Sequence, residues 1–104
     1  MSVQFIPSRI ELYCQPVDLR KGQNGLLSLV EHELKRDSTE DVLFLFSNRS
    51  RSLVKCLFWD RTGYCVLSKR LLSGRFILAH KDQPLIIDRQ SLRLLLDGLS
   101  IFCS

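Results

Sequence analysis

The segment 52-SLVKCLFWDRTGYCVLSKRLL-72 decides the fold, because it predicts two long paired strands joined by a tight turn. Apolar and aromatic residues dominate both halves, as is typical of strands that bury one face. Residues 60–63, Asp-Arg-Thr-Gly, favour a three-residue loop whose glycine takes the left-handed conformation. That register places Lys55 opposite Lys69, whereas a two-residue loop would place Lys55 opposite Ser68.

The segment before the hairpin predicts a strand, a helix and a central strand. Residues 9–14 alternate between polar and apolar side chains, and residues 41–46 form a short apolar run of β-forming residues. Between these strands, Asp18 is expected to cap a helix that runs to residues 37–38 and carries one apolar stripe.

The segment after the hairpin predicts an edge strand and a last helix. Residues 85–87 are apolar, and Asp88 can cap a helix that should stop near Gly98. No repeat or linker divides the chain, so residues 1–104 are expected to form one domain. The order of elements predicts an α+β fold: a mainly antiparallel sheet of about four to five strands, with two helices packed on one face.

The composition is that of an ordinary globular protein, with 45% hydrophobic and 25% charged residues among 104. No apolar run approaches the roughly 18 to 20 residues that a membrane span needs. The first residues, MSVQFIPSR, lack the basic and then apolar order of a secretory signal. We therefore expect a cytoplasmic protein.

The four cysteines do not form a recognisable metal motif. Cys14, Cys56, Cys65 and Cys103 stand far apart, and the chain has only two histidines to complete a ligand set. We expect free thiols that pack as small apolar side chains, and we expect neither a metal nor another cofactor.

Positive charge is concentrated around the predicted hairpin. The net charge of the chain is +4, yet residues 49–75 hold seven basic side chains and one acid, while the rest of the chain is slightly acidic. Such clustering can attract a polyanion, although a solvated sheet face would show the same pattern. The candidate nucleic-acid contacts in this segment are Arg49, Arg51, Lys55, Arg61, Lys69, Arg70 and Arg75.

Aromatic side chains beside these cations permit two interpretations. Trp59 and Tyr64 could stack on bases while basic neighbours hold phosphates. Trp59 and Phe58 are, however, more often core residues than platforms for bases. An exposed patch around Leu57 and Trp59 would instead suit contact with a protein partner.

The stretch 20-RKGQNG-25 is only partly similar to a phosphate-binding loop. It lacks the Gly-x-x-x-x-Gly-Lys-Ser/Thr and Gly-x-Gly-x-x-Gly spacings. Arg20 and Lys21 are still candidates for a phosphate contact near the predicted helix start, with solvent-facing cations as the alternative.

The sequence offers no convincing catalytic group. Neither His32 nor His80 has a serine or cysteine nucleophile at a known motif spacing. Glu31, Glu33 and Asp37 cluster near the end of the first predicted helix and could hold a metal, or be solvated or paired with nearby bases. We therefore expect no enzymatic activity.

Three segments together resemble one known family. Residues 18-DLRKGQNGLLSLV-30 are similar to its D-M/L-R-K-G-x-x-G-L-x-x-L-V motif. Residues 44–76 are similar to its second block, in which F-x-F-x-x-R is followed by K-x-L-x-W-D-x-x-G-x-x-x-x-x-K-R-L-x-x-G-x-F. Residues 88-DRQSLRLLLDGL-99 are similar to its terminal x-x-x-L-x-x-L-L-x-G-I/L. These motifs resemble the accessory open-reading-frame protein, called TnpB, of the bacterial insertion-sequence family numbered sixty-six.

The resemblance covers nearly the whole chain and implies a role in transposition beside a separate, larger transposase. Together with the basic hairpin, it leads us to expect DNA of the element ends, and the transposase and other proteins of the same element, as partners. Phe58 and residues 23–24 depart from the family pattern, which leaves the local surface chemistry open. The residues that match motif positions include Arg20, Lys21, Gly22, Arg49, Lys55, Trp59, Asp60, Gly63, Lys69, Arg70, Leu71, Gly74, Arg75 and Phe76.

Hypotheses of different classes follow from these observations. The first is a non-catalytic accessory protein for DNA transposition that contacts the DNA backbone through a basic β-hairpin. The alternative is a protein-interaction module that docks on the transposase through Leu57 and Trp59 without binding DNA. A third, a stand-alone nuclease, would need a metal held by Glu31, Glu33 or Asp37.

Overall fold

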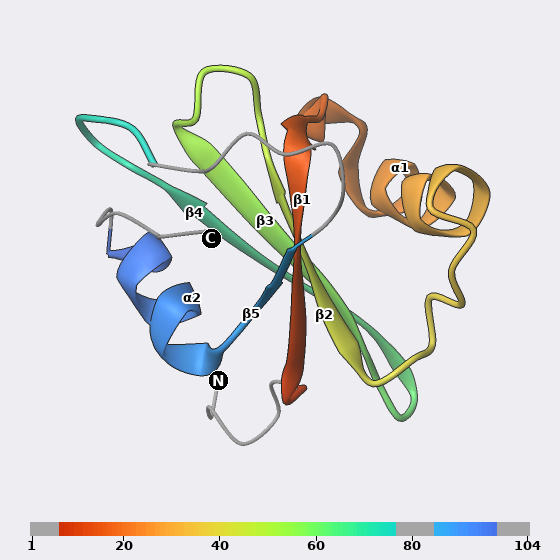
Figure 1. Cartoon of the computed structure of the whole chain (residues 1–104). Coiled ribbons are helices and arrows are strands. Elements are labelled where there is room, and N and C mark those ends of the chain that lie inside the picture. Colours follow the sequence, from red (N-terminus) through yellow and green to blue (C-terminus); the bar gives the residue numbers. More distant parts are fainter. Residues whose placement is uncertain (1–6, 77–84, 98–104) are drawn as a thin grey trace.

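Within residues 7–76 and 85–97, which the computed structural model describes, five strands form one open sheet (Figure 1). Their order across the sheet is β4-β3-β2-β1-β5. All of them lie close to the positions that the sequence predicts. The strands are β1 (Arg9–Pro16), β2 (Val42–Ser47), β3 (Leu53–Asp60), β4 (Gly63–Arg70) and β5 (Leu85–Ile87).

The sheet is mixed. β1 and β2 are parallel, and the other neighbouring strands pair antiparallel, so the mainly antiparallel α+β fold is confirmed. Parallel strands need a crossover connection. Here it consists of the 3-10 turn η2 (Leu19–Lys21), the helix α1 (Gly22–Ser28) and the π-helical turn η3 (Leu29–Glu33).

Asp18 caps the start of this connection, as the sequence predicts. Its Oδ1 accepts a hydrogen bond from the backbone N–H of Arg20 at 3.1 Å. The predicted helix end at residues 37–38 is wrong, because η3 already ends at Glu33. Lys35 follows with φ 53, and such a left-handed residue turns the chain out of the helix.

Each face of the sheet has its own helix and its own apolar cluster. Leu26 and Val30 of the crossover pack on one face, and Leu92 and Leu95 of α2 (Arg89–Leu96) pack on the other. The two helices accordingly lie on opposite sides of the sheet in Figure 1. The prediction that both helices pack on one face is wrong. All six residues of β2 are buried, and a continuous apolar run is typical of a strand covered on both faces.

The last helix begins as predicted. Asp88 Oδ1 accepts from the backbone N–H of Ser91 at 2.7 Å. Its predicted end at Gly98 lies outside the described residues, as do His80 and Cys103.

The cysteines that the structure describes are free thiols. Cys14 and Cys56 are buried and Cys65 is partly buried. Burial raises the pKa of Cys56 to about 12, so this thiol packs as an uncharged, small apolar side chain.

The three-residue loop predicted for the hairpin is wrong. Asp60 pairs with Gly63 and Lys55 pairs with Ser68, so the loop has two residues. The positive φ falls on Arg61, at 47°, and Gly63 does not need its conformational freedom. A shift of one residue in the pairing moves every side chain of β4 to the opposite face relative to its partner on β3. Lys55 and Lys69 therefore lie on opposite faces and do not repel each other.

Candidate nucleic-acid interface

The parallel strands β1 and β2 end at the same end of the sheet, where β3 begins and β4 ends (Figure 1). We call this the basic end. The opposite end, with the β3–β4 turn and the starts of β1 and β2, is called the turn end. In open sheets, ligands commonly bind beyond the carboxyl ends of parallel strands.

A hollow of about 810 Å³ opens at the basic end. It lies between the segment that follows β1, the loop that follows β2, and the adjoining ends of β3 and β4. Among its lining residues, Asp18 is the one acid. The lining includes four cations from separate segments of the fold: Arg20, Arg49, Lys55 and Arg70.

Lys55 is fixed at the base of this hollow. Its Nζ donates a hydrogen bond to the backbone carbonyl of Leu19 at 3.0 Å, and the side chain is half-buried. The contact ties β3 to the crossover connection. Because an ammonium group has three N–H donors, Lys55 keeps further donors for an anion.

Asn48 shapes the loop between β2 and β3. Its side-chain Oδ1 accepts from the backbone N–H of Ser52 at 3.0 Å and of Leu53 at 3.1 Å, and its carbonyl accepts from Arg51 N at 3.2 Å. Sequence reasoning missed this residue. The available signal was an asparagine directly after a buried strand, since asparagine commonly bonds to its own turn.

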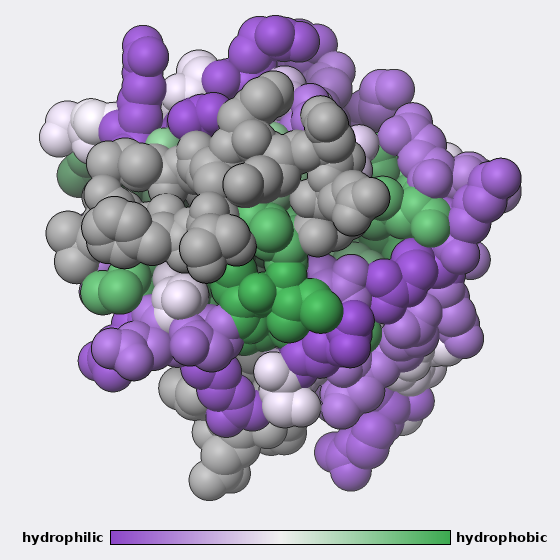
Figure 2. Space-filling view, viewed as in Figure 1, coloured by the Kyte–Doolittle hydropathy of each residue, from purple (hydrophilic) through white to green (hydrophobic). Residues whose placement is uncertain are grey.

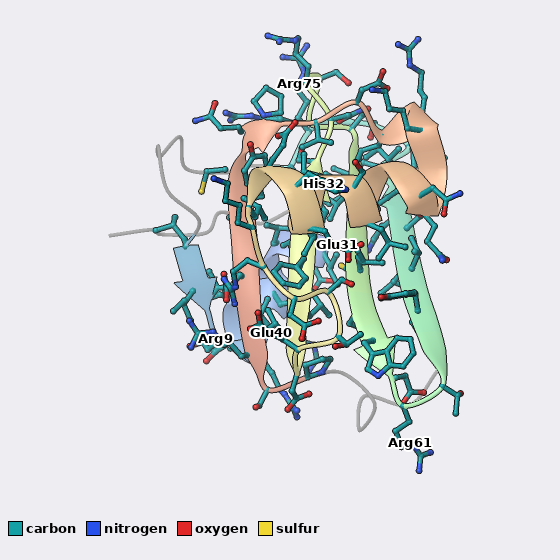
Figure 3. All side chains as sticks on the ribbon, turned by 90° about the vertical axis from the view of Figure 1, so that its right-hand side faces the viewer. Arg9, Glu31, His32, Glu40, Arg61 and Arg75 are labelled. Atoms are coloured by element: carbon teal, nitrogen blue, oxygen red, sulfur yellow. The ribbon has the colours of Figure 1, made fainter. Side chains whose placement is uncertain are left out.

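The loop after β4 joins the Asn48 loop in one ridge. Leu71 N donates to Ser52 O at 3.0 Å, and Phe76 N donates to Arg51 O at 2.7 Å. Phe76 is 1% exposed and anchors the ridge in the core. Arg75 consequently lies at the basic end, as Figure 3 shows.

Arg20 is paired with the one acid of the hollow. Its Nε lies 2.9 Å from Asp18 Oδ1, and its Nη2 lies 3.0 Å from Asp18 Oδ2. The hydrogen bonds from Arg20 lower the pKa of Asp18 to about 2, so this carboxylate is charged at neutral pH. Lys21 lines an adjacent, smaller hollow that also includes Asp18.

The structure brings together most, but not all, of the predicted contacts. Arg61 lies at the turn end, opposite Arg75 in Figure 3, and its Nε is 3.9 Å from Asp60 Oδ1. Lys69 pairs with Val54 and therefore faces the α2 side of the sheet. The predicted residues that gather at the basic end are Arg20, Lys21, Arg49, Arg51, Lys55, Arg70 and Arg75.

The predicted apolar contact patch does not form as expected. Leu57 is 0% exposed and belongs to the core on the α1 face. Trp59 is partly buried and meets Tyr64 edge-on, with ring centroids 4.9 Å apart. The hydrophobic surface in Figure 2 lies elsewhere, near the centre of the view where Figure 1 places β5, and Ile86 of β5 is 63% exposed.

At the turn end, arginine side chains are held by carboxylates. Arg36 contacts both oxygens of Glu11, at 2.8 and 2.9 Å, and also Glu40 at 2.9 Å. Arg9 adds a contact to Glu11 at 3.0 Å. The hydrogen bonds from Arg36 lower the pKa values of Glu11 and Glu40 despite partial burial.

The carboxylates of Glu31, Glu33 and Asp37, which could have held a metal, do not form a metal site. Asp37 lies beyond the helix and accepts hydrogen bonds from Thr39, while Glu31 and Glu33 are exposed. Across residues 7–76 and 85–97, no group of three or more His, Cys, Asp or Glu side chains could hold a metal ion. In the same residues, no helix is long and apolar enough to cross a membrane.

Comparison with known proteins identifies relatives over most of the chain. A family model described as IS66 Orf2 like protein matches residues 8–102. The uncharacterized protein y4jC of Sinorhizobium fredii is 37% identical over 92 residues, which cover 88% of this chain and 79% of that protein. The uncharacterized protein y4hO of the same organism is 36% identical over 83 residues, which cover 79% and 72%. No solved structure matches the chain.

Proposed function

We propose that this chain, which belongs to the IS66 Orf2-like protein family and so has an accessory role in transposition, contacts the DNA backbone through its basic end without catalysing a reaction. The observation that carries the proposal is the gathering of Arg20, Arg49, Lys55 and Arg70 around one hollow with a single acid. These residues come from four separate segments.

The basic end is a better candidate for the DNA-binding surface than the whole β3–β4 hairpin. Arg49, Arg70 and Arg75 form no ion pair with any residue that the structure describes, so their charges are available to phosphates. Phosphate contacts by arginine and lysine supply most of the affinity of sequence-independent DNA binding.

Salt dependence tests this proposal. Each phosphate that the protein neutralises releases counterions, so affinity for duplex DNA should fall steeply as salt rises. We expect the double variant Arg49→Ala/Arg70→Ala to weaken binding and to reduce the slope of log K against log salt by roughly two. Fluorescence anisotropy with labelled element-end DNA measures both quantities.

A matched control removes the same charge elsewhere. Arg61→Ala/Lys69→Ala also deletes two exposed cations, but neither residue lines the hollow. We expect this variant to keep the salt slope of the unmodified protein. Equal loss of slope in both double variants, or binding that ignores salt, would refute contact through the basic end.

A second candidate function is docking on the transposase without DNA contact. The exposed Ile86, on an edge strand of the sheet, supports this alternative better than Leu57 or Trp59 does. It predicts co-purification with the transposase that survives nuclease treatment and high salt. Loss of that co-purification in Ile86→Ser, with DNA binding absent throughout, would favour the alternative.

A further inference from the structure

The hollow at the basic end has an apolar floor as well as a cationic rim. Leu19 is 3% exposed, and Val17 and Leu53 are half-buried; all three line the hollow and pack against the core of the α1 face. A surface that only held phosphates would not need this floor. Its aliphatic side chains offer a dry contact for a flat, weakly polar group.

The cations differ in burial: Arg20, Arg49 and Arg70 are exposed, whereas Lys55 is half-buried at the base of the hollow. Lys55 is held beside the floor by Leu19 O, and Arg20, Arg49 and Arg70 approach from different segments. Asn48 adds a neutral amide group to the lining. This combination of an apolar floor with a few convergent polar groups is typical of small-ligand sites.

The size of the hollow suits an unpaired nucleotide better than a stacked base pair. Its volume of about 810 Å³ lies within the range of roughly 300 to 1,000 Å³ found for small-molecule sites. A stacked base pair inside a duplex cannot enter it, because its faces are covered by its neighbours. An unpaired nucleotide presents both a free base face and a phosphate.

We infer that the hollow binds a single unpaired nucleotide, with the base against the half-buried Val17 and Leu53 and the phosphate among the exposed cations. The inference deepens the proposed function and rests on it for the polymeric source of the nucleotide, an unpaired DNA strand end. A free mononucleotide offers the same chemistry.

Three DNA ligands separate this inference from simple backbone contact. They are a blunt duplex, the same duplex with a three-nucleotide 5′-phosphorylated overhang, and a single strand of equal length. Contact with one unstacked base on a protein surface changes affinity by roughly five- to a hundredfold. We expect the overhang duplex to bind about tenfold tighter than the blunt duplex at equal salt.

A variant that fills the hollow tests the location. Ser50 is exposed and lines the hollow, so Ser50→Leu adds bulk there without removing a cation or a buried side chain. We expect it to abolish the preference for the overhang while retaining blunt-duplex binding. Ser73→Leu is the matched control, because Ser73 is also exposed but lies outside the lining of the hollow.

Competition identifies the source of the nucleotide. Displacement of the overhang duplex by deoxyadenosine monophosphate would show that a free nucleotide suffices, and displacement by the single strand alone would assign the site to strand ends. Both results support the inference. Equal affinity for blunt and overhang duplexes overturns it and leaves backbone contact intact, whereas no DNA binding with retained mononucleotide binding overturns only the proposed function.

Discussion

The basic end and the turn end of the sheet use arginine in opposite ways. At the turn end, Arg36 satisfies its guanidinium with Glu11 and Glu40. At the basic end, Arg49 and Arg70 line an open hollow and form no ion pair with a described residue. The density of basic residues in a sequence therefore does not identify a binding surface. What distinguishes Arg49 and Arg70 from Arg36 is that no carboxylate among the described residues neutralises them.

The largest expected effect comes from breaking the pairing at the turn end. Arg36→Met leaves Glu11, which is 6% exposed, without its main partner. Removing one partner of a buried ion pair costs about 3 kcal/mol or more, so we expect the free energy of unfolding to fall by about 3 kcal/mol. Urea denaturation measures this loss. A change below about 1 kcal/mol would show that the turn-end pairs are no better than surface pairs.

The dependence of stability on acid pH is a second test of the ion pairs at the turn end. Hydrogen bonds from Arg36 lower the pKa values of Glu11 and Glu40 in the folded chain. Carboxylates with a lowered pKa contribute stability that is complete above their unfolded value, about 4.3, and lost as the pH falls through the folded values. We expect the free energy of unfolding to decline from about pH 5 downward.

In Arg36→Met this decline should be much shallower, because protonation of Glu11 then relieves a buried charge that only Arg9 still pairs. Urea titrations between about pH 7 and pH 3, the window in which carboxylates titrate, compare the two proteins. Parallel acid limbs would show that other carboxylates, and not this cluster, control the acid response.

Glycine substitutions test the backbone at each end. Gly74, in the ridge of the basic end, has φ 80, so we expect Gly74→Ala to lower the free energy of unfolding by about 1 kcal/mol. Gly63, at the turn end, is not in the left-handed region, and an added Cβ would meet no atom within 4 Å. Gly63→Ala should therefore change stability by less than about 0.5 kcal/mol. A clear loss of stability in Gly63→Ala would instead support the three-residue loop.

The smallest expected effect concerns the one acid of the hollow. Asp18 occupies the guanidinium fork of Arg20 in the manner of a phosphate. We expect Asp18→Asn to raise affinity for duplex DNA about two- to threefold, because exposed ion pairs are weak competitors. Asp60→Asn removes the same charge beside Arg61 and should leave DNA affinity unchanged. Equal gains in both variants would indicate a general charge effect.

The sequence predicted the strands well because each carries its own apolar pattern and its own turn signals. It also predicted the caps at Asp18 and Asp88, where a side chain bonds a backbone amide two or three residues away. The loop of the hairpin was predicted wrongly, because Asp-Arg-Thr-Gly suits either loop length. Packing on both faces of β3 and β4 then selected the register.

The sequence predicted that the candidate site would be built from arginine and lysine, but it did not predict which of these residues belong to the site. Arg61 and Lys69 belong to the same basic segment as Arg70, yet one lies at the far end and the other on the far face. Arg20 joins the site from a different part of the chain. Residues that are close in the sequence can therefore lie on different surfaces. Which surface each one reaches depends on the direction of its strand and on the face of the sheet to which it points.

By itself, then, the sequence determined the strands, the caps, the excess of positive charge and the family. The strands and caps are local properties, set by side-chain periodicity and by contacts a few residues apart, while the charge and the family motifs follow from the residue types and their order. Only the tertiary structure decided which cations meet around the hollow, which carboxylates neutralise the rest, and that the helices cover opposite faces. Those outcomes depend on long-range pairing of β1 with β2 and on burial of both faces of β2, which no short stretch of sequence specifies.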